Sequence, residues 1–519
     1  MIKLSDHLYI EPMSAVTARE REQRKAMSLA RHYAAAQPNR THADWTRSST
    51  GANYNIRHDL AALRARAREA ARNNGIVRNL LNVMQSNIIG REGIRLQSRA
   101  RSLSGKKLNK RLNETVEEQF YQWSQRENCT ISGKLDLASV QRLILRQLIR
   151  DGEFLVEMID NAGPFGMQLR VWDVNWLDET YNEQMSNGNR IIMSVEVDPN
   201  NKPVAYWLTT PASEINFTNR RTRTRTRFPA DRMIHGMIIT EDESQTRGVT
   251  WLAGVLMNLK TYQGYVEGVV TSARVAANTF GVLETDVPDD DEFTGNEDEE
   301  GNIVHPSIDS SPLSVTALTP GWKLNQLDPK QPTQNHPEFA RTMLTEIGGG
   351  VSMPYFLLNG DWKAVNFSSS RGGLNEFREI CKDLQTLIGD IFCRPVYHRW
   401  LLSASLNGRI TSNPRELMEL HNPAWRPRGF SYIDPTKDVD TDVTRLRNRM
   451  VTPSEVVAER GGDYIEMLKQ WQADAAIAAE HGIDINAIYS ETSAPTAPKD
   501  TEQPPDEPPE KEEGDDPDK

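Results

Sequence analysis

The segment Gly348–Phe377 restricts the possible folds most strongly, because it has the character of a structured loop held between two helices. Three consecutive glycines end the first helix, and a proline-aromatic stretch follows them. Glycine adopts backbone angles that other residues avoid, and serine side chains accept hydrogen bonds from N–H groups at a helix start. We therefore expect the serines at 368–370 to begin the second helix, with Lys363 and Arg371 at or near the ends of the loop.

No set of side chains suited to bond chemistry accompanies this loop. The chain has neither a GxxxxGK[ST] phosphate-binding loop nor a GxSxG nucleophile elbow. Cys381, Cys393 and His398 come closest to a metal-ligand set, but they lie along one helical stripe and are expected to be packing residues. His235 ends a predicted strand and is expected to be structural. We predict no catalytic residue, metal site or cofactor, and no enzymatic activity.

The composition is that of a rather polar protein with room for several domains. The 519 residues, 38% of them apolar and 7% aromatic, could form two to four domains. No run approaches the roughly 18 apolar residues that a membrane span requires, so none is expected. Three cysteines form no disulfide framework and indicate a reducing cytoplasm.

The net charge of −11 conceals a strong segregation. The segment Glu284–Glu300 has ten acids and no base, and the tail from Ser493 has ten acids and three lysines. Residues 1–150, in contrast, hold 27 Lys or Arg and 13 Asp or Glu. This surplus suits a nucleic-acid partner or acidic protein surfaces, and a solvated basic face is the alternative.

Helical periodicity dominates both ends of the chain. A helix pattern beginning at Ile56 carries arginines at 57, 64, 68 and 72 in one basic stripe, is interrupted at Gly75 and ends at Gly90. Further helices are expected over 13–36, 106–128, 136–150, 249–280, 372–404 with a kink or restart at Pro395, and much of 425–491. The tail from Ser493 has almost nothing to bury and is expected to be disordered.

Strand patterns fill the middle of the chain. They are IRLQS at 94–98, EFLVEMI at 153–159, QLRVWDV at 168–174, RIIMSVEV at 190–197 and PVAYWLT at 203–209. Asp198–Lys202 is a strong turn signal between the last two strands. In the run RRTRTRTR, alternate arginines share one side of a strand, as on an exposed edge or at a contact with nucleic acid or another subunit.

The long helix expected over 249–280 contains Gly254, Gly264 and Gly268. Each glycine costs about 1 kcal/mol relative to alanine inside a helix. Such a cost is understandable where helices approach closely or bend, and simple tolerance is the alternative.

Several motifs follow one another in a distinctive order. They are HYAAA, ADW, LRARAREAARNNGIVRNLLNVMQSNIIGREGIRLQ, RQLIRDGEFLVEM, VEVDPNNKPVAYWL, ADRMIH, SQTRGVTWLAGVL, GGGVSMPYFLLNGDWKAVNFSSSRGGLNEF, WRPRGFSYIDPTKDVD and AERGGDYIEML. This ordered series covers roughly residues 25–475 and resembles the lambda-type family of tailed-bacteriophage portal proteins. Ser352-Met353 is inserted relative to the family signature, and Phe367 replaces the usual tyrosine.

The resemblance implies an α+β portal fold with a helical stem and crown and a mixed α/β wing. Such proteins form homo-oligomeric rings, usually dodecamers, at one capsid vertex and conduct double-stranded DNA during packaging and ejection. The implied partners are terminase, major capsid or scaffold protein, and head-completion or tail proteins, with no membrane. The implied location is the virion, and the host cytoplasm during assembly.

The resemblance also suggests a division of the chain. The regions are 1–248 as wing, 249–336 as stem helix, acidic loop and clip-like segment, 337–404 as tunnel loop and long helix, 405–492 as crown, and 493–519 as acidic tail. Within the tunnel loop 358–371, Lys363 and Arg371 would approach DNA, and the basic N-terminal helix would face subunits or scaffold. Two alternatives remain: Arg371 binds a neighbour's carboxylate at the helix start, or the protein is a non-ring nucleic-acid-binding or scaffolding protein that uses its basic N-terminal half.

Overall fold

The computed structural model describes most of the chain between Thr50 and Gly482. The described ranges are 50–102, 107–211, 223–278, 336–362 and 366–482, with strand pieces at 2–5, 8–10, 282–285, 296–297, 303–304 and 322–325. The helix expected over 13–36, most of the acidic segment, Lys363 and the tail lie outside the described residues.

Helices dominate residues 52–151 and 336–480. The α-helices are α2 (Ala52–Asn73), α3 (Gly75–Ile88), α4 (Lys110–Ser124), α5 (Arg126–Cys129), α6 (Leu137–Asp151), α7 (Leu256–Asn278), α8 (His336–Gly350), α9 (Tyr355–Asn359), α10 (Phe367–Ile388), α11 (Arg394–Leu406), α12 (Pro414–Leu420), α13 (Pro435–Arg447), α14 (Pro453–Glu459) and α15 (Tyr464–Glu480). Short 3-10 turns η3 (Val174–Trp176) and η4 (Ala230–Arg232) and a π turn η5 (Gly389–Cys393) complete the helical part.

Most strands of the described residues lie between β4 and β11, with a few short ones before and after them. They are β1 (Ile2–Ser5), β2 (Leu8–Ile10), β3 (Arg95–Gln97), β4 (Glu153–Asp160), β5 (Met167–Trp172), β6 (Glu183–Gln184), β7 (Arg190–Ile192), β8 (Val195–Val197), β9 (Pro203–Pro211), β10 (Arg223–Pro229), β11 (Met233–Met237), β12 (Val282–Thr285), β13 (Asn296–Glu297), β14 (Ile303–Val304), β15 (Trp322–Asn325) and β16 (Ala424–Arg426). The order of helices and strands confirms the expected α+β class.

The break between α2 and α3 lies where the sequence predicted it. Asn74 caps α3, because its side-chain oxygen accepts hydrogen bonds from the N–H groups of Ile76 at 2.9 Å and Val77 at 3.3 Å. Gly75 is the first residue of the new helix. Beyond the end of α3, Gly90 has φ +70°, which favours glycine and turns the chain toward β3.

β4 is the central strand between two hydrophobic cores. It pairs antiparallel with β5 on one side and β11 on the other. Phe154 and Val156 lie in the larger core, and Leu155 lies in the smaller core, so the period-two pattern of the strand places its two faces on different layers. Helices cover the first face, and the sheet formed by β6–β10 covers the second.

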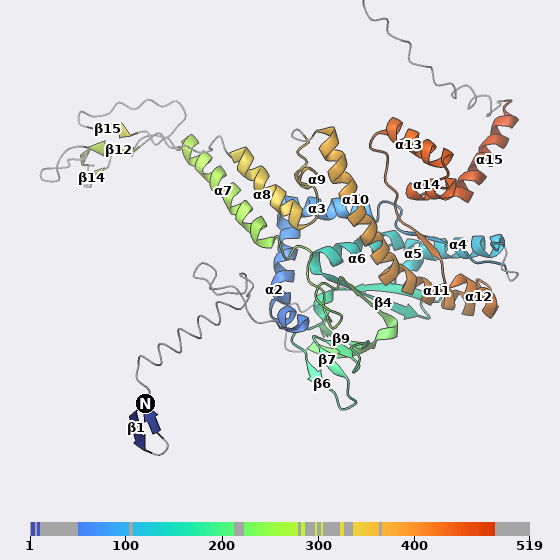
Figure 1. The fold of residues 1–519 in the computed structure, drawn as a ribbon, viewed down its shortest axis with the longest axis horizontal. Coiled ribbons are helices and arrows are strands. Elements are labelled where there is room, and N and C mark those ends of the chain that lie inside the picture. Colours follow the sequence, from blue (N-terminus) through green and yellow to red (C-terminus); the bar gives the residue numbers. More distant parts are fainter. Residues whose placement is uncertain are drawn as a thin grey trace, which may run out of the picture.

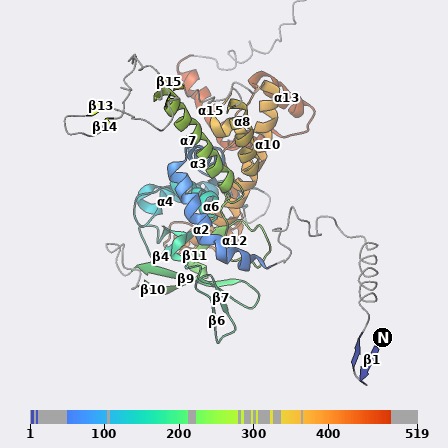
Figure 2. The same ribbon diagram turned by 90° about the vertical axis from the view of Figure 1, so that its left-hand side faces the viewer.

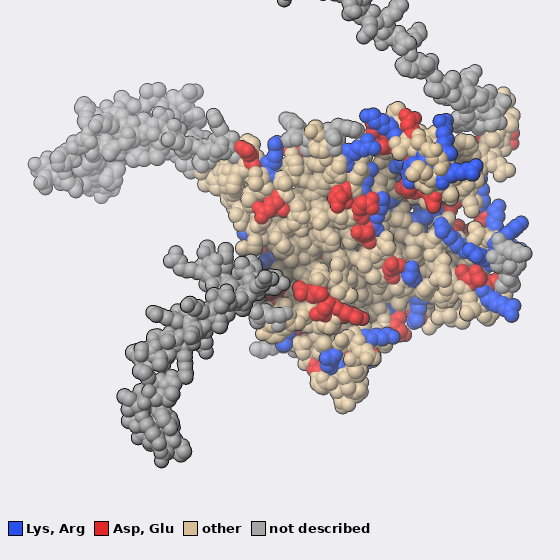
Figure 3. Space-filling view, viewed as in Figure 1, with Lys and Arg blue, Asp and Glu red and all other residues tan. Residues whose placement is uncertain are grey.

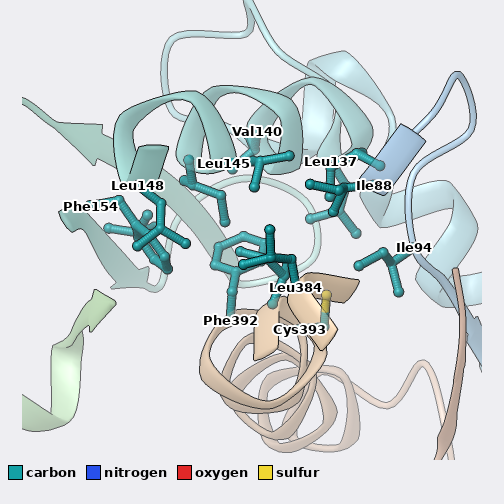
Figure 4. Packing of buried hydrophobic residues seen from close by; sticks show 14 of the residues in the cluster. Ile88, Ile94, Leu137, Val140, Leu145, Leu148, Phe154, Leu384, Phe392 and Cys393 are labelled. Atoms are coloured by element: carbon teal, nitrogen blue, oxygen red, sulfur yellow. The ribbon is translucent and has the colours of Figure 1, made fainter. Parts of the chain in front are cut away.

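The larger core joins α6 to the long helix formed by α10, η5 and α11. In Figure 4 the side chains of the two helices point toward one another; they are Leu137, Val140, Leu145 and Leu148 from α6, and Leu384, Phe392 and Cys393 from the long helix. The sequence predicted a kink or a restart at Pro395. The structure shows a helix that continues through a π turn just before Pro395, which lies in the first turn of α11.

The second sheet has the order β10-β9-β8-β7-β6. The expected turn at Asp198–Lys202 is confirmed, and the Asp198 side chain accepts hydrogen bonds from the N–H groups of Asn200 and Lys202. The expectation of one continuous strand over 190–197 is wrong. Met193 and Ser194 have φ of +47° and +70°, so this segment is a tight hairpin of β7 and β8. β10 is an edge strand, as predicted.

α7 and α8 lie side by side and extend from the body, opposite the C-terminal helices α13–α15 (Figure 1). The pair is joined by a hydrogen bond from Asn258 to Glu346 and by stacking of Tyr265 on His336. α7 begins at Leu256, later than the helix expected from Val249. A Cβ on Gly264 or Gly268 of α7, or on the preceding Gly254, would meet no atom within 4 Å, so no close approach by the described residues explains these glycines.

The C-terminal part contacts the segment that follows α3. β16 pairs antiparallel with β3, which joins residues more than three hundred positions apart. In the view turned by 90° (Figure 2), α7 rises on the side of the body opposite β6, β7 and β9. The body therefore contains helices, two larger sheets and the β3–β16 pair, and the α7–α8 pair extends from it.

Candidate nucleic-acid interface

The end of α8 is held tightly against the rest of the chain. A Cβ on Gly348 would lie closer than 3.0 Å to the carbonyl oxygen of Met353, and one on Gly350 would lie as close to the side chain of Val255. Two of the three glycines are therefore required for close packing. Ser352 takes φ +57°, and the chain then enters α9.

α9 packs against α3, which also holds it by hydrogen bonds. The side-chain amide of Asn79 donates to the carbonyl oxygens of Leu357 at 2.8 Å and Leu358 at 2.9 Å, and Phe356 is buried. Gly360 then ends α9 with φ +76°. The loop that follows therefore starts from a rigid point.

The loop leaves the body at the rim of a groove of about 650 Å³. The groove lies between the α2–α3 junction, α7, α8 and the end of α9; its lining residues are Asn73, Asn74, Gly75, Ile76, Asn79, Tyr262, Gln263, Val266, Glu267, Leu344, Leu358, Asn359 and Gly360. Trp362 packs near Phe356, with ring centroids 5.2 Å apart, and its side chain remains 56% exposed. Asp361 lies 3.5 Å from Arg341, which leaves the first part of the loop nearly neutral.

The second helix begins earlier than the sequence predicted. Asn366, not a serine, is the N-cap of α10, and its side chain accepts a hydrogen bond from the N–H of Ser369 at 2.8 Å. Residues 367–371 are consequently helical, and the non-helical loop is shorter than 358–371. Lys363 lies outside the described residues, so the structure does not bring it together with Arg371.

Arg371 lies in the second turn of α10 and points toward α13. Its Nη2 donates to Asp438 Oδ1 at 2.7 Å, and its side chain remains 38% exposed. The N–H groups of Asp434 and Ile433, together with the Arg371 guanidinium, lower the pKa of Asp438. Arg371 thus has an acidic partner in its own chain, and the sequence reasoning missed Asp438 although it lies within the motif SYIDPTKDVD.

The predicted basic stripe of α2 is not a continuous outer surface. Arg64 is buried and donates to Glu153 Oε1 at 2.6 Å. Arg68 forms a two-nitrogen contact with Asp151 at 2.8 and 2.9 Å and also reaches Asp173 at 2.7 Å. The expectation that the whole stripe faces other subunits or scaffold is therefore wrong for its two central arginines, because acids from later in the chain neutralise them.

Glu153, the first residue of β4, is the centre of a buried cluster of charged side chains. Arg247 donates to both of its carboxylate oxygens at distances of 2.5 to 3.0 Å, and the N–H of Gly248 donates at 3.0 Å. His235 Nε2 lies 2.9 Å from the same carboxylate. Burial would raise the pKa of Glu153, but Arg247, His235 and Arg64 lower it well below its ordinary value. The cluster holds the segment that leads into α7 against the start of β4. His235 belongs to this cluster, so its predicted structural role is confirmed.

Both central residues of this cluster lie in motifs that the sequence already showed, but the sequence did not indicate that they form an ion pair. Glu153 belongs to the Asp-Gly-Glu corner, and Arg247 belongs to the motif SQTRG. Nothing in the spacing of the two motifs indicates that they meet.

The predicted packing role of the cysteines is also confirmed. Cys381 and Cys393 are both buried, and burial raises the pKa of the Cys381 thiol to about 12. Within the described ranges no three His, Cys, Asp or Glu side chains gather as a metal site. Among the same residues no helix has the length and apolar character of a membrane span.

A family model described as "Phage portal protein, lambda family" matches residues 38–385, which is more than half of the chain. The chain belongs to the lambda family of phage portal proteins. A relative named "Probable portal protein" from Halomonas phage phiHAP-1 is 30% identical over 461 residues, covering 87% of each chain. The "Portal protein" of Escherichia phage N15 is 22% identical over 163 residues, covering 30% of this chain and 31% of that one.

Solved structures of gene transfer agent particles are also similar to this portal-family chain. A chain in the neck of the empty particle has 13% sequence identity and a TM-score of 0.43, with 78% of this chain and 93% of that chain covered. A chain in the neck of the native particle has 12% identity and a TM-score of 0.41, with 76% and 91% covered.

Proposed function

We propose that this portal-family protein assembles into a ring at one capsid vertex and forms the conduit through which DNA is packaged and ejected. The observation that carries the proposal is the family match over residues 38–385, which contains the α7–α8 pair, α9 and the loop before α10. Family rings usually contain twelve subunits. The protein would then be part of the virion and would assemble in the host cytoplasm.

The proposed division of the chain follows the family. The regions are 1–248 as wing, 249–336 as stem and clip-like segment, 337–404 as tunnel loop and long helix, 405–492 as crown, and 493–519 as acidic tail. Terminase, the major capsid or scaffold protein, and head-completion or tail proteins are the proposed partners. The projection of α7 from the body supports its assignment as the stem helix (Figure 1).

The loop before α10 and the start of α10 are proposed to contact DNA, through Lys363 and Arg371 respectively. A conduit must touch DNA without retaining it, because each neutralised phosphate adds salt-dependent affinity that a ring would multiply. Arg371 is half-exposed and already bound to Asp438, and this carboxylate moderates its attraction for phosphate. Weak contact from a few such groups per subunit is suited to translocation.

Negative-stain microscopy of the purified protein tests the assembly. We expect closed rings with a central opening, together with a mass by light scattering that is a multiple of the 58.8 kDa chain. A monomer that binds DNA tightly and salt-sensitively would contradict the proposal. That result would support the alternative of a non-ring nucleic-acid-binding protein.

Replacement of both Lys363 and Arg371 by alanine tests the loop. We expect rings to form normally but packaged DNA to decrease several-fold, because phosphate contacts from every subunit are lost together. Full-length packaged DNA can be measured by nuclease protection. Asp438→Asn is the matched control, because it breaks the ion pair and leaves Arg371 charged. If Asp438→Asn reproduced the defect, Arg371 would act within the chain and not on DNA.

A further inference from the structure

A second groove, of about 560 Å³, collects arginines from separate parts of the chain. Its lining residues are Asn82, Gln85, Ser86, Gly90, Arg91, Arg142 and Arg428. They come from α3, the turn after α3, α6 and the segment before α13. This lining contains three guanidinium groups and no carboxylate.

The guanidinium groups of Arg142 and Arg428 are held by neutral acceptors. Arg142 donates to the carbonyl oxygens of Gly90 at 3.1 Å and Arg91 at 2.9 Å, and to Ser139 Oγ at 3.0 Å. Arg428 donates to the carbonyl oxygen of Ser86 and, at 3.3 Å, to Asn87 Oδ1. These bonds orient both groups, and among the described residues neither group forms an ion pair with a carboxylate, unlike Arg64 and Arg68 on α2.

Gly90 makes room for this arrangement. Its backbone has φ +70°, and a Cβ there would lie closer than 3.0 Å to the side chain of Arg428. The glycine thus both turns the chain after α3 and lets Arg428 lie across it. The position of the Arg428 guanidinium is therefore set by the packing of the chain around Gly90.

The positive charge continues beyond the groove along α6. Gln85 connects the two helices: it donates to the carbonyl oxygen of Arg142 at 2.7 Å and accepts from Arg146 at 3.4 Å. Burial and the nearby positive charges of Arg150 and Arg78 lower the pKa of Arg146. On the face shown in Figure 3, Lys and Arg also gather mainly on the side that carries α4 and the C-terminal helices. Like charges that the fold holds together in this way favour an anion from outside the chain.

We propose that the groove formed by Arg91, Arg142 and Arg428 is a binding site for a phosphate group. Guanidinium groups match phosphate oxygens with paired N–H donors, and Asn82 and Ser86 add neutral hydrogen-bonding groups. An acidic peptide fits less well, because peptide sites use apolar or aromatic anchors and this lining has none. The phosphate comes either from the backbone of duplex DNA or from free phosphate. The site is separate from the loop before α10 and does not depend on it.

The test compares two double variants of the full-length protein. Arg142→Gln/Arg428→Gln removes the charges of the groove, and Arg415→Gln/Arg447→Gln removes the same charge from exposed positions on α12 and α13. Inorganic phosphate is titrated by calorimetry at constant ionic strength, and a short duplex DNA is titrated by fluorescence anisotropy. We expect the groove variant to lose about tenfold or more in phosphate affinity, and the control variant to keep it.

Arg91→Glu separates binding from folding. Only the main-chain carbonyl of Arg91 accepts from Arg142, so the substitution preserves that bond and still reverses the charge in the groove. It should weaken phosphate binding while rings remain normal by microscopy. A simultaneous loss of DNA affinity, with a salt slope smaller by about one, would identify duplex DNA as the source. Unchanged DNA affinity would identify free phosphate.

Two results would overturn the proposal. One is that the control variant loses as much phosphate affinity as the groove variants, which would reveal a general effect of net charge. The other is that the groove variants bind phosphate as tightly as the wild type. If they also lose binding of a synthetic peptide with the sequence of residues 284–300, the groove is instead a site for an acidic peptide. The ring-formation test is independent of both, so failure of this site leaves the proposed assembly standing.

Discussion

Glu153→Gln is expected to lower the free energy of unfolding by about 3–5 kcal/mol, because it leaves two buried arginines without their carboxylate. Arg247 and Arg64 both donate to Glu153, and Arg247 is fully buried. Glutamine keeps the size of the side chain, so the loss measures charge and hydrogen bonding and not a cavity. Urea unfolding followed by tryptophan fluorescence measures it.

The control for this substitution is Glu379→Gln on the outer face of α10. Its partner Lys382 lies one helical turn away at 2.6 Å, and both side chains are more than half exposed. Exposed pairs of this kind contribute about 0.5 kcal/mol or less. A similar loss from both substitutions would show that the buried cluster has no special stabilising role.

The pH dependence of the same variant has a defined sign. The folded-state pKa of Glu153 is depressed, so its stabilisation is complete above the unfolded pKa of about 4.3 and is lost as the pH falls through the folded value. Glutamine cannot take up this proton. The difference in unfolding free energy between the wild type and Glu153→Gln should therefore be constant near neutral pH and shrink below about pH 4.

Gly152→Ala is expected to destabilise the fold by about 3 kcal/mol through strain and crowding together. Gly152 has φ +89°, and a Cβ there would lie closer than 3.0 Å to backbone atoms of Val249 and Thr250. Backbone atoms cannot move aside as a side chain can. The melting temperature, measured by circular dichroism, should fall by several degrees.

Gly75→Ala is the matched control. Gly75 begins α3, and a Cβ there would meet no atom within 4 Å. Alanine favours helix formation over glycine by about 1 kcal/mol or less, so this variant should be as stable as the wild type or slightly more stable. If Gly152→Ala were equally harmless, the close packing of the α7 entry against β4 would not be required.

Glu153→Gln and Gly152→Ala alter the same junction between β4 and the segment that leads into α7. Gly152 and Glu153 lie at the start of β4, and Arg247 and Gly248 lie in the segment that connects β11 to α7. A Cβ on Gly248 would also collide with Gly152. This junction fixes the direction in which the α7–α8 pair leaves the body, and we expect the position of the proposed stem to depend on it.

The sequence predicted the elements best where the deciding residues are neighbours. The break at Gly75, the turn after Asp198 and an irregularity of the helix near Pro395 were correctly placed, because a cap, a turn or a proline acts within a few positions. The prediction from sequence was wrong where the same residues suit either one strand or a hairpin. RIIMSVEV suits one strand by composition, but two consecutive residues with positive φ make it a hairpin.

The candidate site shows the same division. The loop and its flanking helices were predicted, but the capping residue was not, because asparagine and serine both cap helices and only the backbone path selects one. The alternation of arginines in β10 correctly indicated an edge strand. Their partners, Asp178 for Arg225 and Glu196 for Arg227, could not be read from spacing.

By itself, the sequence determined the succession of helices and strands, the absence of the catalytic motifs sought and the family. The tertiary structure alone decided which charges are satisfied within the chain and which are not. Arg64 meets Glu153 across 89 positions and Arg371 meets Asp438 across 67, whereas Arg142 and Arg428 converge on one groove without an acid. The physical reason is that helix and strand formation depends on nearby residues, whereas a charge responds to every group that the fold brings within a few ångströms.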